Sequence, residues 1–238
     1  MRQLKVLAVA DTHYINKAQH KCVLEERKTW LAPKLLSHAL AAAEGSQVDV
    51  IVLLGDLVDN GTAVGALSDL TEIKEIVSRS GLPVIVVPGN HDGDPQTYLD
   101  IFGDYEGVHE IKGYKVVSFV DSYKDNDRCQ RELAKMEILE QLDQGDPIIV
   151  VQHNPVYPAI ESPYPYNLTN ARQVAKLYAK HGVILSISGH YHPGISLVIQ
   201  DGVGYITCPA ICEEPHPYAI VTLTDKACRV RFETVNPH

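Results

Sequence analysis

Short runs of apolar, largely β-branched residues recur along the chain and alternate with polar stretches. Two of these runs, residues 50–54 and 148–151, are continuously apolar, which is typical of strands buried on both faces of a sheet. The pattern predicts strands over residues 4–10, 48–54, 83–87, 115–120, 148–152, 183–187, 195–199, 203–207, 218–223 and 228–232.

Other apolar residues recur at helical spacing between these strands. Ser68 is placed to cap the second of the resulting helices and Gly81 to end it. Each stripe is ordinary core packing and carries no functional signal. The stripes predict helices over residues 30–40, 70–77, 133–142 and 174–178.

Strand and helix alternate over most of the chain, which predicts an α/β fold with a parallel or mixed sheet and helices outside it. The last four predicted strands leave no room for helices between them. We therefore expect a second, antiparallel sheet portion there, with a hairpin that turns at Asp201-Gly202.

Composition is that of one compact domain over residues 1–238, with 45% hydrophobic and 21% charged residues. The first apolar run stops at Asp11, too early for a signal sequence or a membrane span, so we expect a cytoplasmic protein that does not bind membranes. The five cysteines are scattered without a CxxC pair, which predicts reduced thiols and no disulfide framework.

A net charge of −9 without a basic cluster argues against binding of a nucleic acid polymer. It does not argue against a small anionic substrate, because bound divalent cations would make their own site positive.

Five polar clusters each follow an apolar run, at the carboxyl end of a predicted strand. Ligands of open α/β sheets bind at that edge, so the clusters are expected to converge. Together they offer aspartate, asparagine and histidine ligands for two adjacent metal ions that share one aspartate, and such a pair can activate water and bind phosphate. The clusters are Asp11-Thr-His13, Gly55-Asp56-Leu-Val-Asp59, Gly89-Asn90-His91-Asp92, Gln152-His153-Asn154 and Gly189-His190-Tyr-His192.

In this order, the clusters resemble the motifs of the calcineurin-like metallophosphoesterase superfamily. The Gly-Asn-His-Asp form, Asp121-Ser122 and the sequence from Cys208 to Glu213 are similar to the small prokaryotic phosphodiesterase branch, which includes class III cyclic-nucleotide phosphodiesterases. The resemblance implies a four-layer αββα sandwich, in which two mixed β-sheets are flanked by helices.

The resemblance also implies two metal sites, with Asp56 and a water or hydroxide bridging them. Mixed oxygen and imidazole ligands suit manganese, iron or zinc, as divalent or trivalent ions, better than calcium, but the sequence does not choose among these metals. The first set of ligands would be Asp11, His13 and His192, and the second Asn90, His153 and His190.

His91 has a different implied role, because it would contact the substrate and protonate the leaving oxygen. Asp59 would hydrogen-bond the far nitrogen of its ring and keep it oriented. Asp92 is expected to fix the backbone of the loop. Asn90 would also contact the phosphate.

Three tyrosines follow the His153 cluster in a proline-rich segment, and they are candidates for contact with the organic part of a substrate. They are Tyr157, Tyr164 and Tyr166. Residues 14–26, which are polar and weakly patterned, are a second candidate wall of the site.

One difference from the superfamily pattern narrows the range of substrates. Serine/threonine phosphatases of the superfamily carry arginine directly after the second aspartate of the Gly-Asp motif, where this chain has Asn60. Without an arginine for a dianionic phosphate, a diester substrate is favoured over a monoester.

The sequence thus predicts a binuclear metal-dependent phosphodiesterase that acts on a small phosphate ester. A phosphomonoesterase or nucleotide pyrophosphatase of the same superfamily stays open, and so does a non-catalytic protein-binding scaffold. A homodimer is compatible with the sequence.

Overall fold

The computed structural model describes residues 2–16, 27–142 and 145–237. Its strands are β1 (Gln3–Val9), β2 (Val50–Leu53), β3 (Val84–Val86), β4 (Gly107–Ile111), β5 (Tyr114–Ser118), β6 (Ser122–Tyr123), β7 (Cys129–Gln130), β8 (Ile148–Val151), β9 (Val183–Ser188), β10 (Ile195–Gln200), β11 (Val203–Thr207), β12 (Pro217–Thr224) and β13 (Cys228–Thr234). Its α-helices are α1 (Ala32–Ser46), α2 (Ala66–Ser78), α3 (Pro95–Phe102) and α4 (Ala171–Lys180), with 3-10 turns η1 (Thr29–Leu31), η2 (Asp125–Asp127) and η3 (Leu133–Glu140).

Two large sheets are formed by the described residues. One has five strands in the order β13-β12-β1-β2-β3, and the other has six in the order β10-β11-β9-β8-β5-β4. The pairs β1–β2 and β2–β3 are parallel, as are β5–β8, β8–β9 and β9–β11. Antiparallel strands complete both sheets, which are therefore mixed.

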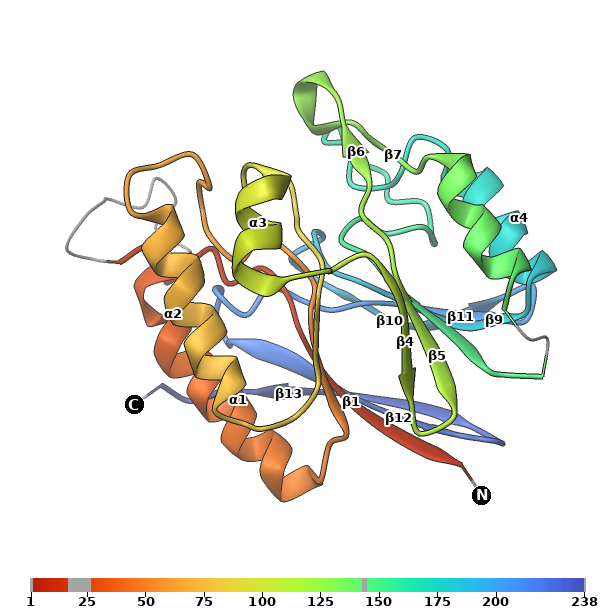
Figure 1. Ribbon diagram of the computed structural model, residues 1–238, viewed down its shortest axis with the longest axis horizontal. Helices are drawn as coiled ribbons and strands as arrows, with labels where there is room; N and C mark the ends of the chain where they lie inside the picture. The colour runs from red at the N-terminus through yellow and green to blue at the C-terminus, as the bar shows by residue number, and fades with distance from the viewer. Residues whose placement is uncertain (1, 17–26, 143–144, 238) are drawn as a thin grey trace.

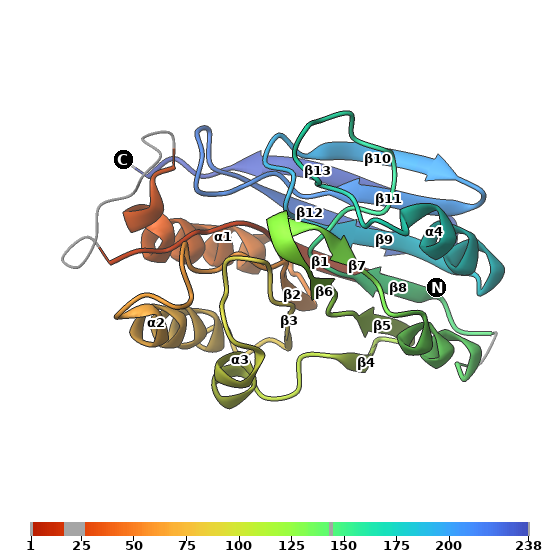
Figure 2. The same ribbon diagram turned by 90° about the horizontal axis from the view of Figure 1, so that it is seen from above.

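The two sheets pack face to face across a shared apolar core. Residues such as Val50 and Val52 of the first sheet meet Val116 and Ile187 of the second in that core. Helices α1, α2 and α3 cover the outer face of the first sheet, and α4 with η3 covers the outer face of the second (Figures 1 and 2). The predicted four-layer αββα sandwich is confirmed.

The last four strands differ from the prediction, because they do not form one antiparallel unit. Strands β10 and β11 extend the six-stranded sheet, whereas β12 and β13 join the five-stranded sheet through β1. Strand β12 is buried on both faces: Val221 lies in the core between the sheets and Ile220 in the core under the helices. The hairpin between β10 and β11 does turn at Asp201-Gly202, where φ is 50° and 82°.

Local predictions fail where capping or packing decides the outcome. Helix α2 begins at Ala66 with Gly65 as its N-cap, so Ser68 lies inside the helix. Residues 133–140 form 3-10 turns instead of an α-helix. Trp30 is 38% exposed and precedes α1. The described cysteines are all free thiols, while Cys22 lies outside the described residues.

The sheet topology brings the carboxyl ends of the parallel strands of both sheets to one edge. Asp11, Asp56 and Asn90 follow β1, β2 and β3 of the first sheet. His153 and His190 follow β8 and β9 of the second. Among the described residues, no helix is both long and apolar enough to cross a membrane.

Candidate metal centre

The backbone that carries the polar clusters turns sharply as it leaves the strands. Asp11, His13, Asp56 and His190 all have left-handed backbone, with φ of 55°, 42°, 49° and 68°. This conformation is uncommon for residues other than glycine and is found mainly where the surrounding structure imposes it. It turns each side chain towards the common edge of the two sheets.

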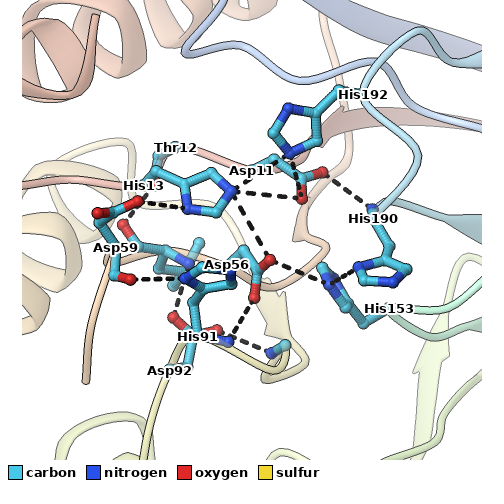
Figure 3. Close-up of polar contacts among 12 residues, drawn as sticks. Asp11, Thr12, His13, Asp56, Asp59, His91, Asp92, His153, His190 and His192 are labelled. Carbon is cyan, nitrogen blue, oxygen red and sulfur yellow. Dashed lines mark hydrogen bonds and ion pairs between the residues drawn. The ribbon is translucent and has the colours of Figure 1, made fainter. Parts of the chain in front are cut away.

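Asp11, His13 and His192 form the first cluster of candidate ligands (Figure 3). The Nε2 atoms of His13 and His192 are 3.3 Å apart. Oδ1 of Asp11 lies 3.6 Å from Nε2 of His192, and it is buried with no hydrogen-bond partner among the described residues.

Asp56, His153 and His190 form the second cluster. Nε2 of His153 lies 3.1 Å from Nδ1 of His190 and 3.4 Å from Oδ2 of Asp56. Asn90 faces the same cavity as Asp56 and His190, and its Oδ1 is buried without a partner in the described chain. The amide oxygen is thus available as a further ligand.

Asp56 lies between the two clusters. Its Oδ2 is 3.7 Å from Nε2 of His13 and 3.4 Å from Nε2 of His153, one in each cluster. Its Oδ1 accepts a 2.8 Å hydrogen bond from the main-chain N–H of His91. Figure 3 shows this carboxylate with one contact towards each group of histidines.

Three of the histidines are held through their outer nitrogens. Nδ1 of His13 faces Oδ1 of Asp59 at 3.1 Å, and Nδ1 of His192 faces Oε1 of Glu213 at 2.5 Å. Nδ1 of His153 faces the main-chain oxygen of Leu54 at 2.5 Å. An oxygen acceptor places the proton on Nδ1 and leaves the lone pair of Nε2 pointing inward.

Inward lone pairs that face each other at about 3 Å repel unless a cation lies between them. The donor atoms are oxygen and imidazole nitrogen, which suits manganese, iron or zinc. The residues therefore fit metal ions.

In the second cluster, a proton shared between Asp56 and His153 can relieve part of this repulsion when no cation is bound. Burial alone would raise the pKa of Asp56, but the positive charge of His153 holds it well below its ordinary value. Burial opposes the charge on His153, yet Asp56 raises the pKa of this imidazole to about 10. Burial and the neighbouring His153 lower the pKa of His190. A cation entering the second cluster must displace the proton on His153.

His91 lies beside the first cluster, with its ring 4.7 Å from that of His13 in an edge-to-face arrangement. Its Nδ1 donates to the main-chain oxygen of Asp59 at 2.6 Å. We expected the Asp59 side chain to make this contact, and that prediction is wrong. The ring N–H of His91 is already hydrogen-bonded to the main-chain oxygen of Asp59. The Asp59 carboxylate is therefore free to face His13 and Arg27 instead.

Asp92 is fully enclosed below this loop. It accepts hydrogen bonds from the main-chain N–H groups of Leu57, Val58 and Gly89, at 2.7, 3.1 and 2.8 Å. These bonds tie the loop after β2 to the loop after β3, as expected for a residue that fixes the backbone.

A cavity of about 420 Å³ opens beside the two clusters. Tyr164 and Tyr166 line it, with rings 5.6 and 5.5 Å from that of His190. Tyr157 does not line it, because its ring packs against Tyr205 and its hydroxyl bonds Gln200. Most of the other candidate wall, residues 17–26 of the stretch 14–26, lies outside the described residues.

Three residues that were not predicted from the sequence also line the cavity, namely Arg27, Asp127 and Glu213. Glu213 could have been found, since it ends the Cys208–Glu213 segment that resembles the small prokaryotic phosphodiesterase branch. Arg27 and Asp127 lie in polar stretches with no motif around them. No sequence signal marks them.

Two adjacent clusters of buried oxygen and imidazole donors at one edge of the sandwich could hold metal ions that activate water and bind a phosphate ester. The chain belongs to the calcineurin-like phosphoesterase family, whose sequence model matches residues 4–194.

Two curated relatives are similar over most of the chain. A protein of Fibrobacter succinogenes named "probable cyclic nucleotide phosphodiesterase" is 24% identical over 213 residues, which cover 86% of this chain and 78% of the relative. A "probable glycerophosphodiester phosphodiesterase" of Arcobacter nitrofigilis is 25% identical over 214 residues, covering 79% and 71%.

Among solved structures, a dimetal phosphatase from Danio rerio superposes with a TM-score of 0.76 at 15% identity, over 98% of this chain and 97% of that one. This likeness supports the fold.

Proposed function

We propose that the protein is a binuclear metal-dependent phosphodiesterase that hydrolyses a small phosphate ester. The observation that carries the proposal is the position of Asp56, whose carboxylate lies between two clusters of inward-facing histidines. The names of the two curated relatives, both phosphodiesterases, support a diester substrate.

Asp56 would be shared by two metal ions, which bound here would act as Lewis acids on the phosphate and lower the pKa of a water molecule. The first ion would be held by Asp11, His13 and His192, and the second by Asn90, His153 and His190. Asp59 and Glu213 would keep His13 and His192 in the orientation that metal binding needs.

His91 would be the proton donor to the leaving oxygen. The Asp59 carbonyl fixes the proton on Nδ1, so Nε2 is the nitrogen that can exchange a proton with a substrate in the cavity. Asn90 would also contact the phosphate. Tyr164 and Tyr166 would contact the organic group, because their rings form the wall beside His190.

A first experiment compares three substrates with protein loaded with Mn²⁺: bis-p-nitrophenyl phosphate, p-nitrophenyl phosphate and 2′,3′-cyclic AMP. We expect hydrolysis of the diesters to be faster than that of the monoester, and loss of activity in Asp56→Asn. If fully loaded protein hydrolyses none of the three, that result would contradict the proposal and favour the non-catalytic binding scaffold.

His91→Ala tests the proton donor. The variant should lose most activity on a diester with an alkyl leaving group, which needs a proton, and little on p-nitrophenyl esters, whose leaving group does not. General acid catalysis typically contributes about 10²–10⁴-fold. Equal losses on both kinds of ester would remove His91 from this role.

A further inference from the structure

Arg27 contributes a positively charged side chain to the wall of the cavity. It belongs to none of the sequence motifs. Its main chain is fixed there: residue 27 forms an antiparallel bridge with residue 213, and the N–H of Lys28 donates to the oxygen of Cys212 at 2.7 Å. The same segment carries Glu213, which holds His192. Arg27 is thus built into the frame of the metal centre.

The guanidinium of Arg27 is only partly satisfied by its neighbours. Nη1 lies 3.2 Å from Oδ1 of Asp59 and 3.2 Å from Nδ1 of His13. The side chain is 17% exposed, and its Nε–H is buried without a partner among the residues described. A buried, incompletely bonded guanidinium is costly unless an anion completes its contacts.

Asp59 contacts Nη1 of Arg27 through a single oxygen, which also faces the N–H of His13. This contact leaves the other N–H donors of the guanidinium without a carboxylate partner in the part of the chain that the structure describes. Arginine presents five N–H donors in a planar fork that matches the oxygens of a phosphate.

We propose that Arg27 binds a non-bridging oxygen of the substrate phosphate and contributes more to the binding of a dianionic monoester than to that of a monoanionic diester, in a site that still hydrolyses diesters faster. The proposal rests on the phosphoesterase function proposed above. Arg27 would take the role of the phosphate-binding arginine that the serine/threonine phosphatases carry at the position of Asn60. Asn60 itself accepts hydrogen bonds from Thr62 in a turn. The site would then also accept monoesters, through a contact that contributes less to the binding of diesters.

Three variants test the role of Arg27. Arg27→Gln removes the charge and Arg27→Lys keeps it without the fork. Arg229→Gln is the matched control, because it also removes one arginine charge, but far from the site. Arg229 of β13 pairs with Thr222 of β12, which in turn pairs with Lys5 near the start of β1. The candidate metal ligands follow the opposite end of β1. Each protein is loaded with Mn²⁺, and its metal content is measured.

Two quantities are compared: kcat/KM for p-nitrophenyl phosphate against bis-p-nitrophenyl phosphate, and the affinity for inorganic phosphate by calorimetry. In Arg27→Gln, the monoester value and the phosphate affinity should fall roughly tenfold or more, as expected for a lost charged hydrogen bond. The diester value should fall clearly less. Arg27→Lys should recover part of the loss, and Arg229→Gln should match the parent protein.

Equal losses on both esters together with lost metal would show that Arg27 acts only through Asp59 and His13, and would overturn the proposal. Unchanged phosphate affinity in Arg27→Gln would also overturn it. If the parent protein hydrolyses neither ester and not 2′,3′-cyclic AMP either, the proposed function fails, but the phosphate titration still decides whether Arg27 binds phosphate.

Discussion

Four candidate metal ligands are held on left-handed backbone, with φ between 42° and 68°. For a residue with a Cβ atom this conformation costs about 1–2 kcal/mol. Such strain persists where the surroundings enforce it and is common at functional sites. The backbone conformation of these four residues therefore lowers the free energy of unfolding. They are Asp11, His13, Asp56 and His190.

This cost can be measured at Asp11, where φ is 55°. In metal-free protein, Asp11→Ala and Asp11→Gly remove the same carboxylate, but only alanine keeps the strained Cβ. Urea denaturation should give Asp11→Gly the higher free energy of unfolding, by about 1 kcal/mol.

His153 is the matched control, because it is not among the residues with positive φ. There the order should reverse, and His153→Gly should be less stable than His153→Ala by about 0.5–1 kcal/mol. The same order at both positions would contradict a backbone origin of the difference.

The proton on His153 gives a second prediction at this scale. Its pKa is raised to about 10, so near pH 7 the cation-free protein carries that proton, while His13 and His190 have lowered pKa values and carry none. Burial opposes a charge on His192, but its hydrogen bond to Glu213 raises the pKa of this imidazole. Metal binding should therefore release at least the proton of His153, and metal affinity should weaken at least tenfold per pH unit as the pH falls. Calorimetry in buffers of different ionisation enthalpy measures this release, and a value of zero would contradict the charge assignment.

Among the elements, the loops after β2 and β3 can approach each other only because Gly89 has no side chain. A Cβ atom on Gly89 would overlap the Asp56 carboxylate and come within 2.6 Å of the Asp56 main-chain nitrogen. The position of the Asp56 carboxylate thus depends on this glycine.

Gly89→Ala should therefore displace Asp56 and lower metal affinity by an order of magnitude or more, since misplaced ligands and their partners typically cost about 10–100-fold. Gly45→Ala in α1 is the control, because a Cβ there meets nothing within 4 Å. It should leave metal binding intact and stabilise the helix by about 0.5–1 kcal/mol. Parent-like metal affinity in Gly89→Ala would refute the close-approach argument.

The elements also show what the sequence could and could not predict. Strand β8 was predicted because burial on both faces leaves a continuous apolar run. The pairing of β12 with β1 was not, since an apolar strand does not reveal which neighbour it bonds. Five motif clusters marked the candidate metal site. The position of Arg27 and the direction of the Asp59 side chain depend on loop packing and could not be predicted.

At the scale of the whole molecule, each cluster of candidate ligands draws on both sheets. Asp11 and His13 follow β1 of the first sheet, while His192 follows β9 of the second. Asn90 follows β3, and His153 follows β8. Bound cations would therefore join the two halves of the sandwich at one edge.

Metal should accordingly raise the stability of the whole fold. A cation that binds only the folded state at 100 times its dissociation constant adds about 2.7 kcal/mol. We expect Mn²⁺ to raise Tm and a chelator to lower it, with little response in Asp56→Asn. A full response in that variant would mean that the stabilising ion binds elsewhere.

Anomalous diffraction from a crystal grown with Mn²⁺ tests most directly whether Asp56 is shared by two ions. We predict two peaks about 3.5–4 Å apart, one beside Asp11, His13 and His192 and one beside Asn90, His153 and His190, with Asp56 touching both. A single peak, or none within reach of Asp56 at full metal occupancy, would contradict the account.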